Sequence, residues 1–209
     1  MLRTVIALTL SLLAAASNLA AAQDNAVKVK YVSLDEDTVQ LQDSVSVYSV
    51  RMVAMQAAAT FKDVHLLINS PGGDMRAAEW LVGQFDMLRA RGKTINCYAG
   101  NYVASAAFFI YLHCDNRYAL KSSRLFPHKI HISFSAPVLP QDLIEVGMET
   151  AMDQERWDQL GMEITGMLPS DYKAFRDSDN SMWPITKVQQ KSTKQWFKVV
   201  DYYVLRMVR

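Results

Sequence analysis

The feature that most constrains the fold is an alternation of extended and helical patterns between residues 64 and 132. Residues 64–68 form a short apolar, β-branched run, typical of a strand buried in a parallel sheet. The run stops at a turn composed of Asn-Ser-Pro-Gly-Gly, residues 69–73. Asp74 can then cap a helix whose apolar residues recur every three or four positions up to about Gly92.

The same alternation continues after Gly92. Residues 93–98 predict a second strand, Gly100 and Asn101 a turn, and residues 104–112 a helix that is apolar on nearly all sides and therefore buried. Residues 123–132 predict a third extended segment. Strands that alternate with helices imply parallel strands joined by right-handed crossovers. The sequence therefore predicts a single α/β domain with a mostly parallel sheet.

The flanking regions give weaker signals. Residues 27–41 contain an alternating stretch that suits an edge strand, and residues 44–60 favour a helix. A long helix is expected within residues 141–167, and the last residues, 196–209, suit either a closing strand or an amphipathic helix. The long helix carries an apolar stripe that fits packing on its own core or, alternatively, contact with another subunit. The stripe consists of Trp157, Leu160, Ile164 and Met167.

The first 22 residues have the pattern of a cleavable signal peptide. Arg3 provides a positive start, an apolar run follows, and the small residues Ala20 and Ala22 suit cleavage before Gln23. The apolar run is short for a membrane span, which needs about 20 residues, although an uncleaved anchor is the alternative. We therefore expect residues 1–22 to be a signal peptide, residues 23–209 to be the domain, and the mature protein to be periplasmic or secreted.

Charge and cysteine content limit the partners and the compartment. The formal net charge is +1, so charge alone implies neither a nucleic acid nor an anionic membrane surface. An oxidising compartment would allow Cys97 and Cys114 to pair; the alternative is two buried, unreactive thiols. The histidines lack the spacing of a metal site with a carboxylate or thiol partner, and no cofactor is expected.

Ser105 is the candidate nucleophile. It follows a strand and begins a buried helix, where unpaired backbone N–H groups and the helix dipole can stabilise an oxyanion. A serine at this position can equally be a simple helix cap. A serine nucleophile needs a base that titrates near neutral pH, and His128 is the best-placed histidine. His131 is the fallback, although an offset of three residues would put it on the opposite face of a regular strand.

Three sequence blocks together resemble the Clp protease proteolytic subunit, in the order and at nearly the spacing of that family. They are Leu-Ile-Asn-Ser-Pro-Gly-Gly at 67–73, Ala-Ser-Ala-Ala at 104–107 and Ser-Arg-Leu-Phe-Pro-His at 123–128. The resemblance implies the Clp protease and crotonase fold, built of stacked ββα units. It also implies that Ser105 attacks a peptide carbonyl, that His128 is the general base, and that Gly73 and Ala106 donate N–H groups to the oxyanion.

The third catalytic residue and the flanking segments match the family less well. The family places an aspartate before the C-terminal helix, which favours Asp179 and leaves Asp177 as the alternative. Two alanines replace the usual Met-Gly after the serine, and Pro127 precedes the proposed base. The N-terminal segment shows no clear counterpart of the loops that dock an ATPase ring, and no ATPase partner is expected.

The sequence favours an exported, ATP-independent serine peptidase that acts on peptides or unfolded proteins, with a homo-oligomer as a further option. A serine–lysine dyad using Lys121 or Lys129 is a variant of this hypothesis. Two alternatives come from other classes: a binding or assembly protein that keeps the fold without the chemistry, and a crotonase-like enzyme acting on acyl thioesters.

Overall fold

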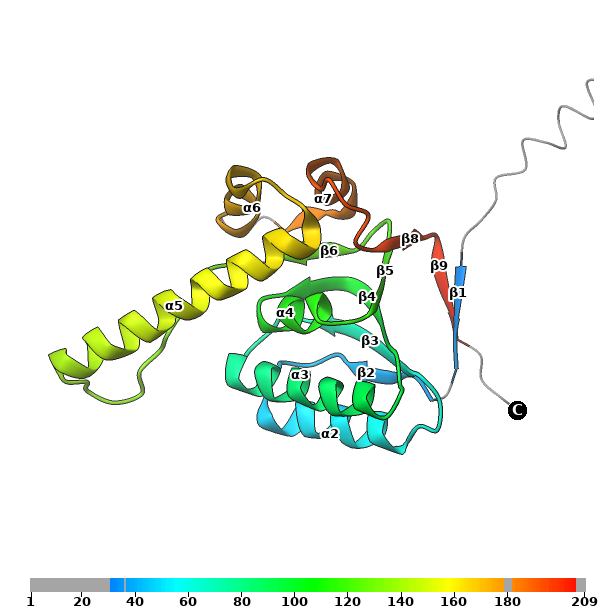
Figure 1. Ribbon diagram of the computed structural model, residues 1–209, viewed down its shortest axis with the longest axis horizontal. Coiled ribbons are helices and arrows are strands. Elements are labelled where there is room, and N and C mark those ends of the chain that lie inside the picture. The colour runs from blue at the N-terminus through cyan, green and yellow to red at the C-terminus, as the bar shows by residue number, and fades with distance from the viewer. Residues whose placement is uncertain (1–30, 36, 179–181, 206–209) are drawn as a thin grey trace, which may run out of the picture. The chain divides into compact units, whose positions relative to one another are not determined.

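The computed structural model describes residues 31–35, 37–178 and 182–205. The expected signal peptide, the start of the expected edge strand at residues 27–30, and Asp179 lie outside the described residues. The chain is a mixed α/β protein whose main sheet is mostly parallel (Figure 1). The predicted fold class is confirmed.

Five parallel strands form the main path of this sheet, in the order β2-β3-β4-β5-β8. β3 alternates buried and partly buried residues, since one face of the strand packs on the core and the other is only partly covered. The strands are β2 (Val39–Leu41), β3 (Val64–Ser70), β4 (Ile95–Ala104), β5 (Asn116–Leu120) and β8 (Lys198–Val200).

Strand β4 is longer than expected, and the turn predicted at Gly100 and Asn101 is wrong. β4 continues to Ala104 because its partner changes: residues 96–99 pair with β5, and residues 102–104 pair with β6 (Arg124–Phe126). At Gly100 an added Cβ would lie 2.7 Å from the Asn69 Cβ, so the glycine makes room for that side chain. β5 was not predicted, and the expected extended segment 123–132 is a strand only in β6.

Three helices follow the sequence prediction closely. They are α2 (Val47–Ala59), α3 (Met75–Ala90) and α4 (Ala106–Leu112), and Figure 1 shows α2 and α3 side by side. Asp74 caps α3 as expected by accepting a hydrogen bond from the Ala77 N–H. α3 buries Leu81 and Phe85, and α4 is buried on nearly all sides. The hydrophobic core therefore surrounds α4, and the start of this helix is held firmly.

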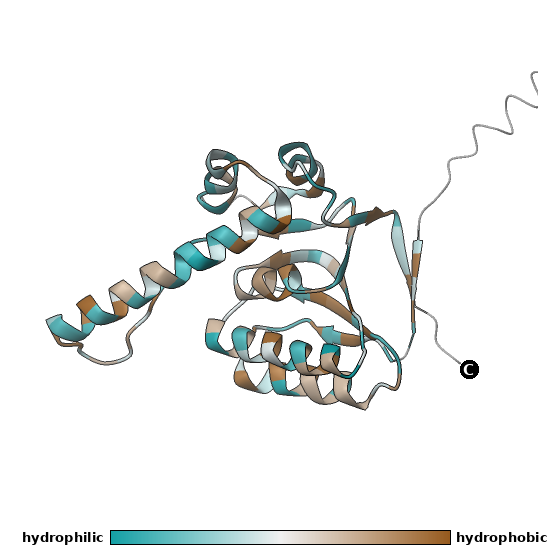
Figure 2. Cartoon of the chain, viewed as in Figure 1, coloured by the Kyte–Doolittle hydropathy of each residue, from teal (hydrophilic) through white to brown (hydrophobic). Residues whose placement is uncertain are grey.

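The C-terminal third adds α5 (Pro140–Thr165), α6 (Pro169–Arg176), β7 (Trp183–Pro184) and α7 (Ile185–Lys191). β7 pairs antiparallel with β6. In the apolar stripe of the long helix, Trp157 packs on Phe109 and Ile164 packs on the core. The N-terminal half of α5 is different, because several large apolar side chains there are exposed. Figure 2 shows hydrophobic positions in brown along this part of the helix. They are Leu143, Ile144, Met148 and Met152.

Two further contacts complete the described fold. β1 (Tyr31–Leu34) and β9 (Tyr202–Leu205) form a small parallel sheet, so the C-terminal segment contains strands within its described part. Cys97 in β4 and Cys114 after α4 form a disulfide with a Cα–Cα distance of 5.9 Å. Of the two expectations for the cysteines, the structure therefore supports the disulfide over two separate thiols. Of the helices described, none has the length and apolar character that crossing a membrane requires.

Candidate active site

Ser105 lies at the turn from β4 into α4 with φ of 54°, the one positive φ among the described non-glycine residues. Such a backbone conformation is strained and persists only where the surroundings enforce it. Here the Ser105 N–H donates to the Phe126 carbonyl over 2.8 Å, which ties the turn to β6. The Ser105 side chain makes no capping hydrogen bond to α4. Its hydroxyl is therefore not used as a helix cap.

The turn of Gly72 and Gly73 packs directly on the Ser105 turn. A Cβ on Gly72 would lie 2.4 Å from the Ser105 Cβ and 2.9 Å from the Ala106 nitrogen, so only glycine permits this approach. Val45 clamps the same turn: its N–H donates to the Gly72 carbonyl, and its carbonyl accepts from the Asp74 N–H, both over 2.8 Å. The packing brings the Gly-Gly segment beside the start of α4, where backbone N–H groups lack helical partners.

A cavity of about 390 Å³ adjoins this turn. Ser105, the two glycines, His128 and His131 all line it. Its apolar wall is formed by Met75, Phe108, Phe109, Leu112 and Trp157, which come from α3, α4 and α5. The cavity brings together side chains from all three blocks of the sequence motif, and it has room for a substrate side chain next to the serine.

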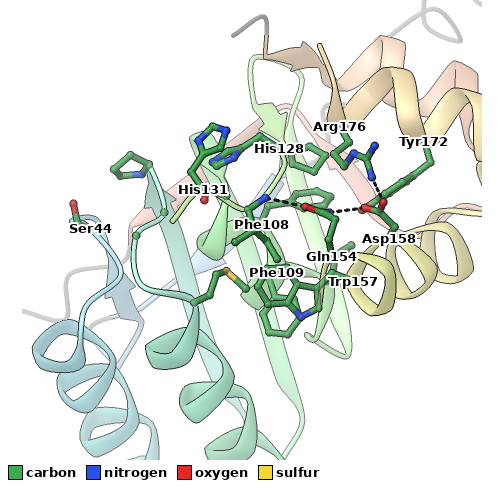
Figure 3. A pocket seen from close by; sticks show the side chains of 18 residues that line it. Ser44, Phe108, Phe109, His128, His131, Gln154, Trp157, Asp158, Tyr172 and Arg176 are labelled. Atoms are coloured by element: carbon green, nitrogen blue, oxygen red, sulfur yellow. Dashed lines mark hydrogen bonds and ion pairs between the residues drawn. The ribbon is translucent and has the colours of Figure 1, made fainter. Parts of the chain in front are cut away.

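His131 lies in the same cavity as His128, contrary to the expectation that it would face the opposite side. Their ring centroids are 5.1 Å apart (Figure 3). The reason is that β6 ends at Phe126, so the alternation of a strand does not apply to the residues that follow. His131 therefore remains the fallback candidate for the base.

The His128 ring is oriented by the backbone. Its Nδ1 lies 2.5 Å from the Lys129 carbonyl oxygen, and a carbonyl can only accept, so Nδ1 carries the proton. In the neutral ring Nε2 is then unprotonated and able to take a proton from a hydroxyl. Among the described residues, no hydrogen bond joins Ser105 Oγ to either imidazole. Such catalytic hydrogen bonds are often long without substrate and shorten in the complex.

Asp177 is engaged by basic side chains. Arg176 donates to both of its carboxylate oxygens, and the ammonium groups of Lys173 and Lys129 lie 3.4 and 3.7 Å away. The hydrogen bond from Arg176 is the main reason that the Asp177 pKa falls to about 2. Of the two lysines considered for a dyad, Lys121 pairs with Asp201 over 2.5 Å and Lys129 with Asp177.

Several residues of the cavity were not recognised from the sequence. Gln154, Asp158, Tyr172 and Arg176 reach it from α5 and α6. Burial raises the pKa of Asp158, and the ion pair with Arg176 opposes that rise. Burial also raises the pKa of the Tyr172 hydroxyl. The only sequence signal for these residues was the apolar stripe of the long helix, which says where the helix packs and not what its polar side chains contact.

The fold and the site together have the arrangement of serine hydrolases: a parallel α/β core, a serine at a strained strand-to-helix turn, a glycine turn packed against it, and imidazoles in the adjoining cavity. The model of the Clp protease family matches residues 21–184, and the chain belongs to this family of serine peptidases. Members of the family typically form oligomers and act on peptides. No curated protein matches the chain.

Proposed function

We propose that the protein is an exported, ATP-independent serine peptidase that cleaves peptide bonds through an acyl-enzyme. The observation that carries the proposal is the Ser105 turn: it is strained, its hydroxyl does not cap the helix, and it opens into the cavity that His128 also lines. A strained backbone at a cavity is common at catalytic serines, because it presents the hydroxyl away from the helix.

In the proposed mechanism, His128 Nε2 takes the hydroxyl proton as Ser105 Oγ attacks the peptide carbonyl. The N–H groups of Gly73 and Ala106 stabilise the resulting oxyanion. Collapse of this intermediate breaks the C–N bond, and His128 returns the proton to the leaving amine. Water then hydrolyses the ester on Ser105 by the same steps, with His128 first accepting and then returning a proton.

For a third catalytic residue, which would share the His128 Nδ1–H with the Lys129 carbonyl, we propose Asp179, with Asp177 as the alternative. The contacts of Asp177 support this order, because its carboxylate is already shared among Arg176, Lys173 and Lys129. A carboxylate held by three cations is a poor partner for an imidazole, since the cations lower its basicity.

Export is supported by the pattern of residues 1–22 and by the disulfide between Cys97 and Cys114, since disulfides persist in oxidising compartments. We propose a periplasmic or secreted location on these grounds. The proposed partners are peptides or unfolded proteins and further copies of the chain, without an ATPase and without nucleic acid.

The second candidate is a binding protein that keeps the fold without the chemistry. It is favoured by one observation: the His128 Nδ1 contacts a backbone carbonyl, where serine peptidases of this type use a carboxylate. A crotonase-like acyl-thioester enzyme would have the same two-donor oxyanion site, but an exported chain would rarely meet such a substrate.

A fluorophosphonate probe decides between the candidates, because it labels an activated serine irrespective of the natural substrate. We expect the purified protein to be labelled and Ser105→Ala to lose all labelling. In His128→Ala the labelling rate should fall by at least about a thousandfold. His131→Gln serves as the matched imidazole control. Absence of labelling in folded wild-type protein would support the binding protein, and loss in His131→Gln with retention in His128→Ala would move the base to His131.

A further inference from the structure

We propose that Gln154 is a positioning residue for His128, acting through the single peptide group between Lys129 and Ile130. The inference rests on the proposed function, in which His128 is the base. Its starting point is that the segment 127–139, which carries His128, belongs to no helix or strand, so the orientation of the ring depends on individual contacts.

The decisive geometry lies at the two ends of one amide. The Lys129 carbonyl accepts from His128 Nδ1–H over 2.5 Å, and the Ile130 N–H of the same peptide group donates to Gln154 Oε1 over 2.8 Å. Because a peptide group is planar and its C=O and N–H point in opposite directions, fixing the N–H fixes the direction of the carbonyl. Gln154 thus orients the carbonyl that in turn orients the imidazole.

Gln154 is itself held by a chain of polar contacts across α5 and α6 (Figure 3). Its Nε2 donates to Asp158 Oδ1 over 2.9 Å, and the other Asp158 oxygen accepts from Arg176. Arg176 also donates to Asp177, whose carboxylate contacts the Lys129 ammonium at 3.7 Å. The chain therefore begins at Ile130 and returns to Lys129, the two residues that share the peptide group.

Burial makes this chain rigid. The side chains of Arg176 and Asp158 are only 12% and 19% exposed, so each charge depends on its protein partners. For Asp158 these partners are Arg176 and Gln154, and for Arg176 they are Asp158 and Asp177. Gln154 matches this arrangement with one acceptor toward Ile130 and one donor toward Asp158. Hydrogen bonds in a chain polarise one another, so the carbonyl facing His128 also becomes a better acceptor.

The test compares fluorophosphonate labelling and peptide hydrolysis in Gln154→Met, Gln154→Asn and wild type. Methionine has similar length without an acceptor, and asparagine keeps the amide but is too short to reach Ile130. We expect kcat to fall between about tenfold and about a hundredfold with KM nearly unchanged, because misplacing a catalytic group by about 1 Å has effects of this size. Gln159→Met, an exposed glutamine on the same helix, is the matched control and should match wild type.

A reciprocal exchange separates positioning from general structural damage. Gln154→Glu alone places two carboxylates four residues apart on α5 and should lower kcat. In Gln154→Glu combined with Asp158→Asn, the donor and acceptor change places: the introduced carboxylate accepts from Ile130 and from the new amide at position 158, whose oxygen accepts from Arg176. We expect this double variant to regain at least half of the wild-type kcat.

Hydrogen exchange gives a readout that needs no activity. The Ile130 amide should exchange at least tenfold faster in Gln154→Met than in wild type and regain protection in the double variant. Wild-type labelling rates in Gln154→Met, or a folded double variant that does not recover, would overturn the inference while leaving the proposed function intact. Failure of the wild-type protein to be labelled at all would instead overturn the proposed function, and with it the positioning role of Gln154.

Discussion

At the scale of single residues, the contact between Gly72 and Ser105 decides whether the serine turn can form. Gly72 has φ of 92°, and any Cβ there would overlap the Ser105 Cβ. The two turns therefore depend on each other, because the strained conformation of Ser105 is possible only while position 72 has no side chain.

We expect Gly72→Ala to reduce labelling of Ser105 at least a hundredfold and to destabilise the protein by about 1–3 kcal/mol, because the new Cβ displaces the serine turn and alanine is strained at positive φ. Labelling rates and thermal unfolding measure the two effects. Gly83→Ala, at a helical glycine with open space around it, is the control and should be stable and fully labelled. Normal labelling of Gly72→Ala would show that the packing of the two turns is not needed.

Residues that belong to a contiguous motif could be named as candidates from the sequence, and residues that contribute only through tertiary contacts could not. Ser105, His128 and the two glycines stand in short blocks whose local chemistry is readable. Gln154 has no such block: its role depends on a peptide group 24 positions away, which only the packing of α5 beside the segment after β6 brings near.

At the scale of elements, strand β4 shows why boundaries are harder to predict than elements. Gly100 and Asn101 carry the composition of a turn, but pairing with β3 and then with β6 keeps this part extended. The same change of partner places Ser105 beside Phe126, and so brings the His128 segment to the serine. The turn that was predicted wrongly therefore lies in β4, the strand that brings Ser105 and the His128 segment together.

The exposed apolar face of α5 predicts self-association. Ile144, Met148 and Met152 are spaced four residues apart and are 57%, 64% and 70% exposed. A stripe of this kind on a helix is typical of an interface. We expect the wild-type protein to be oligomeric by light scattering and Met148→Lys to shift the mass toward the monomer. Gln159→Lys, which adds the same charge at a polar position of the helix, should keep the wild-type mass; a monomeric wild type would contradict the prediction.

At the scale of the whole molecule, the described parts of the α/β fold followed the alternation of strand and helix patterns in the sequence. Helices α2 to α5 were predicted from the spacing of their apolar residues, whereas α6 and α7 were not predicted. The strands β5, β7 and β8 are too short to show a clear alternating pattern in the sequence. Their positions are set by pairing with strands from other parts of the chain.

The ion pairs of Asp177 predict how stability depends on pH. The pKa of its carboxyl is lowered to about 2, so the ion pairs stabilise the fold fully above about pH 5, and the contribution is lost as the pH falls through 2. Asp177→Asn should therefore lower the free energy of unfolding by about 1 kcal/mol at pH 7, since water screens part of the interaction. The difference from wild type should be small at pH 2 and vanish below it.

Denaturant unfolding at pH 7, 4 and 2 measures this dependence. Asp153→Asn removes a more exposed ion pair with Arg156 and should have a smaller effect at pH 7. A difference between Asp177→Asn and wild type that is constant from pH 7 to pH 2 would contradict the assignment, because the effect would then not depend on ionisation.

The disulfide has a practical consequence for producing the protein. Ser105 lies inside the covalent loop that Cys97 and Cys114 close, and a cross-link over a loop of this size stabilises a fold by roughly 3 kcal/mol. That is a large share of the roughly 5–15 kcal/mol that holds a typical domain together. Recombinant protein made in a reducing cytosol would lack this disulfide. Weak fluorophosphonate labelling of such a preparation would reflect the missing disulfide and not the reactivity of Ser105.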